Sequence, residues 1–349
     1  MILQNKIPAI YHSIFPELLD IEFPEEQIAT CDTCTLCRSP QSPYINTKCC
    51  TYHPTLVNFM VGGVMTDDDA SLILGKELIQ NQINARVGVT PYGIIPSLSY
   101  IQLEKEANSI DFWSRPHQLV ESIRCPYSYK GLCTIWKYRE NLCVTFFCSS
   151  IGGAVGKTFW KKVNNYLKMA ETSLAQYAML QLGWSPAKIK TDAVTAADFN
   201  FENHDGQVND AKYSKLWGDW VGREEEFYRN CFEIVKKIDA PTFKQITGLQ
   251  REILEAAIRD TQKDFQLNNL PDFLLLHPDV VSNKSNKEGH SNLVLGEILV
   301  EVPSALLPLI FSFKGKRKTV EVFALGYNLL FNMSDLVDEL RQKGILIKP

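Results

Sequence analysis

Residues 31–37 read CDTCTLC, residues 48–50 read KCC, and residues 125–148 read CPYSYKGLCTIWKYRENLCVTFFC. These stretches hold all but one of the ten cysteines in a chain of 349 residues, and only Cys231 lies elsewhere. Core packing does not produce such grouping, because a buried thiol acts only as a small apolar side chain. We therefore predict a metal centre held by thiolates. The predicted ligands are Cys31, Cys34, Cys37, Cys49 and Cys50 in the first cysteine block, and Cys125, Cys133, Cys143 and Cys148 in the second cysteine block.

A disulfide framework is the competing explanation for so many cysteines. Such frameworks stabilise small secreted domains in oxidising compartments, whereas this chain is long enough to bury a core without them. Residues 1–15 contain a lone Lys6 and a Pro8, with no small-residue cleavage site after them, so no secretory signal is predicted. We therefore expect reduced thiols and a cytoplasmic protein.

Composition and charge narrow the class of protein further. Apolar residues make up 45% of the chain, which is typical of a globular protein. The net charge of −4 argues against nucleic acid as a general partner. The longest apolar stretch, residues 304–313, contains Pro308 and is too short to cross a bilayer, so no membrane association is predicted.

Changes in sequence pattern predict an α+β protein with three domains. Residues 1–157 form an irregular, cysteine-rich metal-binding domain, in which metal bonds replace part of the hydrophobic core. Within it, residues 67–83 predict a short helix that the acidic run at its start caps, rather than a cation site. Residues 158–270 form a helical middle segment, and residues 271–349 form a small winged-helix-like domain.

Three helices are predicted in the middle segment. Thr158 is the expected cap of the first, which carries apolar residues at three- and four-residue intervals. The other two cover residues 224–238, where Cys231 is expected to be buried and unreactive, and residues 241–265. Residues 198–217 are rich in Asn and Asp and are predicted to be a loop.

Residues 152–158, GGAVGKT, come close to a phosphate-binding glycine loop. The pattern requires four residues between its first glycine and the Gly-Lys pair, whereas Gly152 and Gly156 are separated by three. Nucleotide binding is therefore not predicted. The stretch is interpreted as a flexible glycine turn that lets Cys148 reach the metal before the next helix begins.

The last domain combines short strands and short helices. Residues 293–303 predict strands, and residues 304–313 fit either a helix or a strand. Its expected helix caps are Thr319 and Ser334, with Gly344 at the end of the last helix. This pattern is typical of a winged-helix-like unit, which can read DNA or bind a peptide.

The two cysteine blocks resemble the YkgJ family, whose members carry an early cysteine group ending in a Cys-Cys pair. A later segment of that family has the form Gly-x-Cys-x-Ile-Tyr-x-x-Arg-Pro-x-x-Cys-x-x-Phe-x-Cys. Here Trp136 stands at the tyrosine position and Glu140 at the proline position, and the first cysteine block is more widely spaced than is usual. The matching residues are Gly131, Cys133, Ile135, Trp136, Arg139, Cys143, Phe146 and Cys148.

This resemblance covers residues 31–148 and implies a zinc- or iron-chelating cysteine cluster, related to the cluster of flagellin lysine methylases. The last domain resembles PqqD-type peptide-recognition modules, through residues 307–323 and 336–346. Together the two resemblances imply a protein or peptide as substrate.

The residue types alone leave the metal open between soft-ligand alternatives. Thiolates favour zinc and iron–sulfur centres over magnesium or calcium. The equal spacing of Cys31, Cys34 and Cys37 favours a 4Fe–4S cluster, whereas zinc more often takes pairs of cysteines. His53 and His117 are interpreted as groups that support the site or lie at the surface, rather than as ligands.

Three functions remain open at this point. The first is a metalloenzyme that modifies a protein or peptide presented by the C-terminal domain. The second is a non-catalytic binding or regulatory module with a structural metal. The third is a winged-helix DNA-binding metal or redox sensor that uses the basic stretch 314–318. No catalytic triad, dinucleotide fingerprint or paired-carboxylate site stands out, so hydrolase and dehydrogenase activities are not predicted.

Overall fold

A computed structural model shows an α+β protein, 55% helix and 13% strand, whose strands form several small antiparallel sheets. The predicted α+β class is thus confirmed. No helix among the described residues is both long enough and apolar enough to cross a bilayer. The structure describes residues 1–26, 42–45, 47, 50–112, 114–147, 150, 152–189, 201–203, 206–267, 271, 273–315, 317–319, 322 and 333–349.

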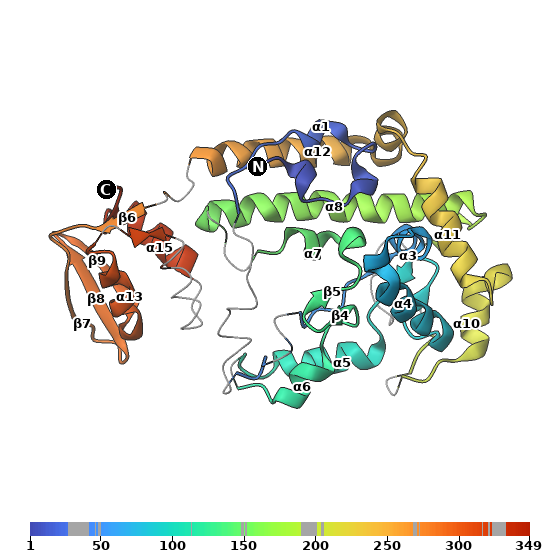
Figure 1. Cartoon of the computed structure of the whole chain (residues 1–349), viewed down its shortest axis with the longest axis horizontal. Coiled ribbons are helices and arrows are strands. Elements are labelled where there is room, and N and C mark those ends of the chain that lie inside the picture. Colours follow the sequence, from blue (N-terminus) through green and yellow to red (C-terminus); the bar gives the residue numbers. More distant parts are fainter. Residues whose placement is uncertain are drawn as a thin grey trace.

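Helix α8 (Gly153–Gln181) is the central element of the fold. It runs alongside α12 (Ala240–Leu267), and the two helices lie side by side in Figure 1. Helix α11 (Glu224–Val235) packs against both α8 and α3 (Asn58–Thr66), and it buries Cys231 as predicted. The apolar stripe predicted for α8 is confirmed as its buried face, which includes Phe159, Trp160, Val163, Leu167, Ala170, Leu174 and Ala178.

The predicted start of α8 is wrong. The helix begins at Gly153, and Thr158 lies inside it, where its hydroxyl donates to the backbone oxygen of Ala154 at 2.9 Å. A Cβ on Gly152 would lie 2.4 Å from the ring of Phe265, and a Cβ on Gly156 would lie 1.9 Å from Ser150 Oγ. The glycines therefore permit close packing against a helix, and the interpretation as a flexible turn is wrong.

The loop predicted at residues 198–217 is also wrong in its second half, because α10 (Asp210–Trp217) occupies it. The side chain of Asn209 caps this helix by accepting a hydrogen bond from the backbone N–H of Lys212 at 3.0 Å. Tyr213 and Trp217, four residues apart, bury one face of the helix. Asn therefore marks a helix start here rather than a loop.

Short elements surround these helices in the first part of the chain. The predicted helix at residues 67–83 is present as η3 and α4, and the Asp69 carboxylate caps its start by accepting from the backbone N–H of Ser71 at 2.8 Å. A small sheet has the order β1-β3-β2. The elements are η1 (Leu3–Asn5), η2 (Ala9–Tyr11), α1 (Pro16–Leu19), β1 (Leu56–Val57), η3 (Ala70–Leu72), α4 (Ile73–Ala85), β2 (Val89–Thr90), β3 (Gly93–Ile94), α5 (Leu98–Asn108), α6 (His117–Ser122), β4 (Ser128–Tyr129), β5 (Leu132–Cys133), η4 (Trp136–Tyr138), α7 (Asn141–Thr145), η5 (Pro186–Lys188) and η6 (Gly218–Trp220).

One hydrophobic core, whose members run from Leu3 to Phe265, joins α3, α8, α11 and α12 with many of the short elements. A small satellite cluster lies between α5 and α6, around Tyr100 and Leu119. A separate core, from Leu274 to Leu346, belongs to the C-terminal unit. The predicted domain limits at residues 157 and 270 stay predictions.

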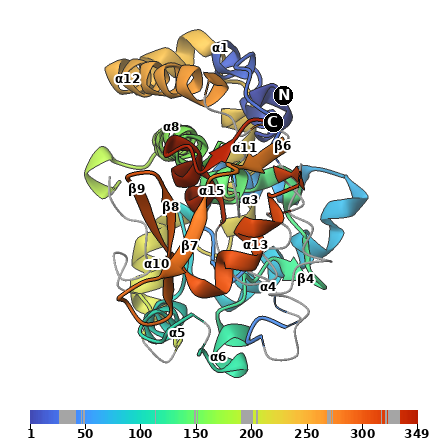
Figure 2. The ribbon, with the colours of Figure 1, turned by 90° about the vertical axis from the view of Figure 1, so that its left-hand side faces the viewer.

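The C-terminal unit contains two three-stranded antiparallel sheets, with the strand orders β7-β8-β9 and β10-β6-β11. In Figure 2 the strands β7 to β9 lie on one side of this unit and α13 on the other. The segment 304–313 is helical, and Gly344, with a φ of +69°, follows the last helix as predicted. The elements are β6 (Phe273–Leu276), β7 (Val281–Lys284), β8 (His290–Leu295), β9 (Ile298–Pro303), η7 (Ser304–Leu306), α13 (Leu307–Ser312), β10 (Arg317–Lys318), α15 (Met333–Gln342) and β11 (Leu346–Ile347).

Two predicted helix caps of this unit have different outcomes. Most of the helix expected after Thr319 lies outside the described residues, and the Thr319 hydroxyl donates to the backbone oxygen of Pro271 at 2.6 Å. Ser334 is predicted to cap a helix that starts at Asp335, but it lies within α15, which begins two residues earlier at Met333. Helix α15 contacts α8, and Figure 1 shows that this contact is near the end where α8 begins.

Candidate metal centre

Four of the predicted ligands lie in the described part of the chain: Cys50, Cys125, Cys133 and Cys143. Cys125, Cys133 and Cys143 are free thiols in the structure, and each is partly buried. The predicted ligands Cys31, Cys34, Cys37, Cys49 and Cys148 lie outside the described residues.

The two cysteine blocks meet at a backbone hydrogen bond. The N–H of Cys125 donates to the carbonyl oxygen of Cys50 at 2.8 Å. The end of the first cysteine block therefore lies directly against the start of the second, although 75 residues of sequence separate them.

A second contact joins the residues that flank the other ends of the blocks. Ser150 Oγ donates to the Glu26 carboxylate at 2.6 Å, and Trp160 Nε1 donates to the same oxygen at 2.7 Å. Glu26 precedes the first cysteine block, and Ser150 follows the second. The end of the first block thus contacts the start of the second, and the residue Glu26 before the first block contacts the residue Ser150 after the second.

A β-hairpin positions Cys133 close to Cys125. Strands β4 and β5 pair so that Ser128 lies opposite Cys133, and the N–H of Ser128 donates to the Cys125 oxygen at 3.0 Å. Lys130 and Gly131 form the turn with φ values of +46° and +74°, the left-handed pair that a two-residue hairpin turn requires.

Helix α7 positions Cys143, and Glu140 caps this helix. The Glu140 carboxylate accepts hydrogen bonds from the backbone N–H groups of Leu142 at 3.0 Å and Cys143 at 3.3 Å. Its charge also lies near enough to raise the pKa of the Cys143 thiol. Arg139 Nη1 donates to the Cys143 carbonyl oxygen at 3.4 Å, so a cation also lies beside this cysteine.

The thiols of the second cysteine block lie near enough to influence one another's ionisation. The pKa of Cys125 is raised to about 12, mainly by burial and in part by the neighbouring Cys133 and Cys50. Burial also raises the pKa of Cys133 and that of Cys143. Without a metal these thiols stay protonated at neutral pH, because thiolate needs a nearby positive charge in a buried site.

These thiols are donors of the type that a soft metal prefers. Thiols are the donors that zinc and iron–sulfur clusters use, and a bound metal ion would remove their protons. Among the described residues, however, no three His, Cys, Asp or Glu side chains are arranged to hold a metal ion. A complete site therefore requires cysteines that lie outside the described residues.

The two histidines near the cysteines make other contacts. His53 is buried, and its Nδ1 lies 3.0 Å from the Pro54 carbonyl oxygen. His117 Nδ1 lies 2.9 Å from the Pro43 carbonyl oxygen. The interpretation of both as groups that support the site or lie at the surface stays a prediction.

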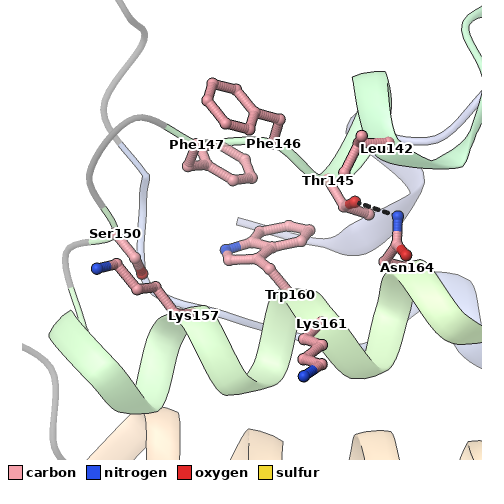
Figure 3. Close-up of a pocket in the computed structure, with 9 residues that line it drawn as sticks. All are labelled: Leu142, Thr145, Phe146, Phe147, Ser150, Lys157, Trp160, Lys161 and Asn164. Carbon is pink, nitrogen blue, oxygen red and sulfur yellow. Dashed lines mark hydrogen bonds between the residues drawn. The ribbon is translucent and has the colours of Figure 1, made fainter. Parts of the chain in front are cut away.

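A cavity of about 200 Å³ opens between the second cysteine block and the start of α8. Figure 3 shows the rings of Phe147 and Trp160 close together on its wall, with centroids 4.5 Å apart, and the hydrogen bond between Thr145 and Asn164 at its edge. Its volume is below the roughly 300–1,000 Å³ of most small-molecule sites, so we assign no cofactor to it. The lining residues are Leu142, Thr145, Phe146, Phe147, Ser150, Lys157, Trp160, Lys161 and Asn164.

Sequence reasoning missed a pair of buried carboxyl groups beside the cysteines. Glu140 and Glu171 are 2% and 3% exposed, and burial raises the pKa of each. The charge of Glu140 raises the pKa of Glu171 further. The available signal was the position of Glu171, because it lies on the apolar stripe of α8 between Leu167 and Leu174.

No family model, curated protein or solved structure matches this chain. The resemblance of its cysteine segments to the YkgJ family, and of its last domain to PqqD-type modules, therefore stays a prediction from sequence.

Proposed function

We propose that this chain is a metal-binding cysteine-cluster protein, in which thiolates of both cysteine blocks hold an iron–sulfur cluster or zinc. The observation that carries the proposal is the backbone hydrogen bond between Cys125 and Cys50, at 2.8 Å. Because it joins the two blocks, thiols from distant parts of the sequence can share one centre. The equal spacing in CDTCTLC favours a 4Fe–4S cluster over zinc.

The described thiols have the electrostatic surroundings that such a centre needs. A cluster with several thiolates carries negative charge, and the Arg139 guanidinium next to Cys143 would offset part of it. Burial, which disfavours thiolate in the metal-free protein, strengthens the attraction between a thiolate and a metal cation. Cys125, Cys133 and Cys143 would serve as ligands from the second block.

Exposed apolar side chains beside the thiols support a protein or peptide as partner. Leu132, Trp136 and Phe146 are 72%, 62% and 57% exposed, and all three belong to the second cysteine block. Apolar side chains gathered at a surface are typical of interaction sites. We propose that the partner is a protein or peptide substrate whose side chain is modified at the metal centre.

The C-terminal unit is proposed to present that substrate. It combines short antiparallel strands with short helices, which supports the proposal of a winged-helix-like, PqqD-like domain, and its helix α15 contacts α8. The same helix α8 lines the cavity beside the second cysteine block. A peptide held by the C-terminal unit would therefore be bound by a unit that rests on the helix lining this cavity.

Elemental analysis and an absorption spectrum of protein purified without oxygen test this proposal. We expect iron and sulfide with broad visible absorption, or zinc without colour, and loss of that metal in Cys133→Ala. Cys231→Ala is the matched control, because Cys231 is fully buried in the core of α11 and is not a proposed ligand. Wild-type protein without bound metal would refute the proposal.

A structural metal without catalysis is the second candidate function. The partial burial of Cys125, Cys133 and Cys143 favours it, because a closed site leaves little room for a reacting group. Turnover of a peptide substrate by the metal-loaded protein would exclude this candidate.

A DNA-binding sensor has less support, since Lys314 of the basic stretch lies over the ring of Phe311, 4.7 Å from its centroid. That alternative requires DNA binding that weakens with salt.

A further inference from the structure

We propose that Glu171 of α8 is a positioning residue for Cys143, and that it acts by fixing the side chain of Asn141. The proposal rests on the proposed function, because it concerns one of the ligands of the proposed metal centre. Asn141 is the first residue of α7, and Cys143 follows it within the same short helix.

Helix α8 holds both ends of the Asn141 amide. Asn141 Nδ2 donates to Glu171 Oε2 at 2.6 Å, and Asn141 Oδ1 accepts from Asn164 Nδ2 at 2.9 Å. Asn164 Nδ2 also donates to Thr145 Oγ1, at 3.0 Å, at the other end of α7. These contacts fix the rotation and the axial position of α7 against α8, which apolar packing alone would specify less tightly.

The Glu171 carboxyl itself is held by a second group. Tyr11 Oη donates to Glu171 Oε1 at 3.5 Å, so the two carboxyl oxygens have separate partners. Glu171 is 3% exposed and lies on the stripe of α8 that otherwise carries apolar residues.

A carboxyl group at this place is not explained by stability. Replacing a buried polar network by well-packed apolar side chains is often neutral or stabilising, whereas removing one member of the network is destabilising. A leucine at position 171 would continue the apolar stripe of Leu167 and Leu174. The carboxyl is accounted for by what it fixes, namely the helix that presents Cys143.

Glu140 acts on the same cysteine from the other side. Its carboxylate caps α7 through the backbone N–H groups of Leu142 and Cys143. One carboxyl thus fixes the backbone of α7 at its start, and the other fixes the helix on α8. Groups behind the ligands of a metal site typically change metal affinity about 10- to 100-fold when they are removed.

The experiment compares Glu171→Leu and Glu171→Gln with Glu224→Leu and Glu224→Gln. Glu224 is a matched control, since it is also buried and accepts from a tyrosine, Tyr213 Oη at 3.2 Å, but it lies on α11. Each holoprotein is titrated with a chelator, and the concentration that removes half of the metal is measured together with the absorption spectrum and the midpoint of urea unfolding.

We expect Glu171→Leu to release its metal at about one tenth of the chelator concentration that the wild type needs. Glu171→Gln should stay close to wild type, because the amide oxygen can still accept from Asn141. The Glu224 variants should lose stability without a change in chelator resistance or spectrum. If Glu171→Leu fails to fold, Asn141→Ala removes the same hydrogen bond from a partly buried residue, and the same loss of chelator resistance is expected.

Two results would overturn the inference. One is Glu171→Leu, or Asn141→Ala in its place, with the chelator resistance of the wild type. The other is an equal loss of resistance in Glu224→Leu, which would show that lowered stability alone releases the metal. Wild-type protein that binds no metal would instead refute the proposed function, so the two failures are distinguishable.

Discussion

His53 gives a pH dependence of stability whose size follows from its surroundings. Its ring is 7% exposed and packs edge-on against Tyr100, with ring centroids 5.1 Å apart. Burial lowers the pKa of His53 from 6.5 to about 4, and hydrogen bonds with Pro54 and with its own backbone oppose this only in part. The folded protein therefore keeps the imidazole neutral at pH values where the unfolded chain protonates it.

The sign and size of the effect follow from linkage. Because the pKa is lower in the folded state, the unfolded chain binds more protons as the pH falls below 6.5, and the free energy of unfolding decreases. The contribution is fully present above pH 6.5 and is lost progressively towards pH 4. The difference between 6.5 and about 4, at about 1.4 kcal/mol per pKa unit, corresponds to about 3 kcal/mol in all, of which about 2 kcal/mol is lost by pH 5.

Urea unfolding of wild type and His53→Gln between pH 8 and pH 4.5 measures this contribution. The glutamine amide can still donate to the Pro54 oxygen but cannot be protonated. The stability advantage of the wild type should therefore shrink by about 2 kcal/mol between pH 8 and pH 5. Other titrating groups cancel in the subtraction, provided that both proteins carry the same amount of metal. A difference that stays constant from pH 8 to pH 5 would show that burial does not hold the ring neutral.

Three further predictions concern packing and the metal. Gly62→Ala should lower the free energy of unfolding by about 2–3 kcal/mol, because a Cβ would lie 1.9 Å from the Tyr228 carbonyl oxygen where α3 crosses α11. Gly315→Ala has open space around its new Cβ and should change the free energy of unfolding by less than about 0.5 kcal/mol. Urea unfolding measures both variants, and equal effects would contradict the packing. Trp160→Phe removes the indole donor to Glu26 and should lower the free energy of unfolding by about 1–3 kcal/mol. Trp136→Phe, at an exposed position, should leave the free energy of unfolding unchanged in the same urea experiment. If Trp160→Phe also leaves it unchanged, this hydrogen bond does not hold the two cysteine blocks together. Removal of metal by a chelator should leave the helical circular dichroism signal unchanged, because α8, α11 and α12 share an apolar core. Loss of that signal would show that the helices need the metal in order to stay folded.

The sequence predicted helix faces better than helix ends. The apolar spacing of α8 identified its buried side, since side chains three and four residues apart necessarily share a face. Its start was missed because Gly152 and Gly156 disfavour a helix locally, and only contacts with Phe265 and Ser150 explain their presence. Such contacts join residues far apart in sequence and leave no periodic signal.

In the candidate site too, local patterns can be predicted from the sequence, whereas contacts between distant residues cannot. Cysteine spacing predicts the thiol ligands, because it is a local pattern that can be read from the sequence. The pairing of Asn141 with Glu171 could not be predicted, since it depends on how α7 lies on α8. A charged residue on an apolar stripe was visible in the sequence, but its partner was not.

The second cysteine block is held in place by contacts that involve no sulfur. Tyr127, Ile135 and Val144 are buried in the main hydrophobic core, so the backbone on either side of the thiols is fixed by apolar packing. Asn141 is fixed on α8 by hydrogen bonds at both ends of its amide. A proposed ligand whose backbone is already ordered would lose little conformational entropy when metal binds. These contacts would therefore favour metal binding by ordering the ligands in advance. The metal would then act mainly to join the first cysteine block to a surface that the rest of the fold has already built.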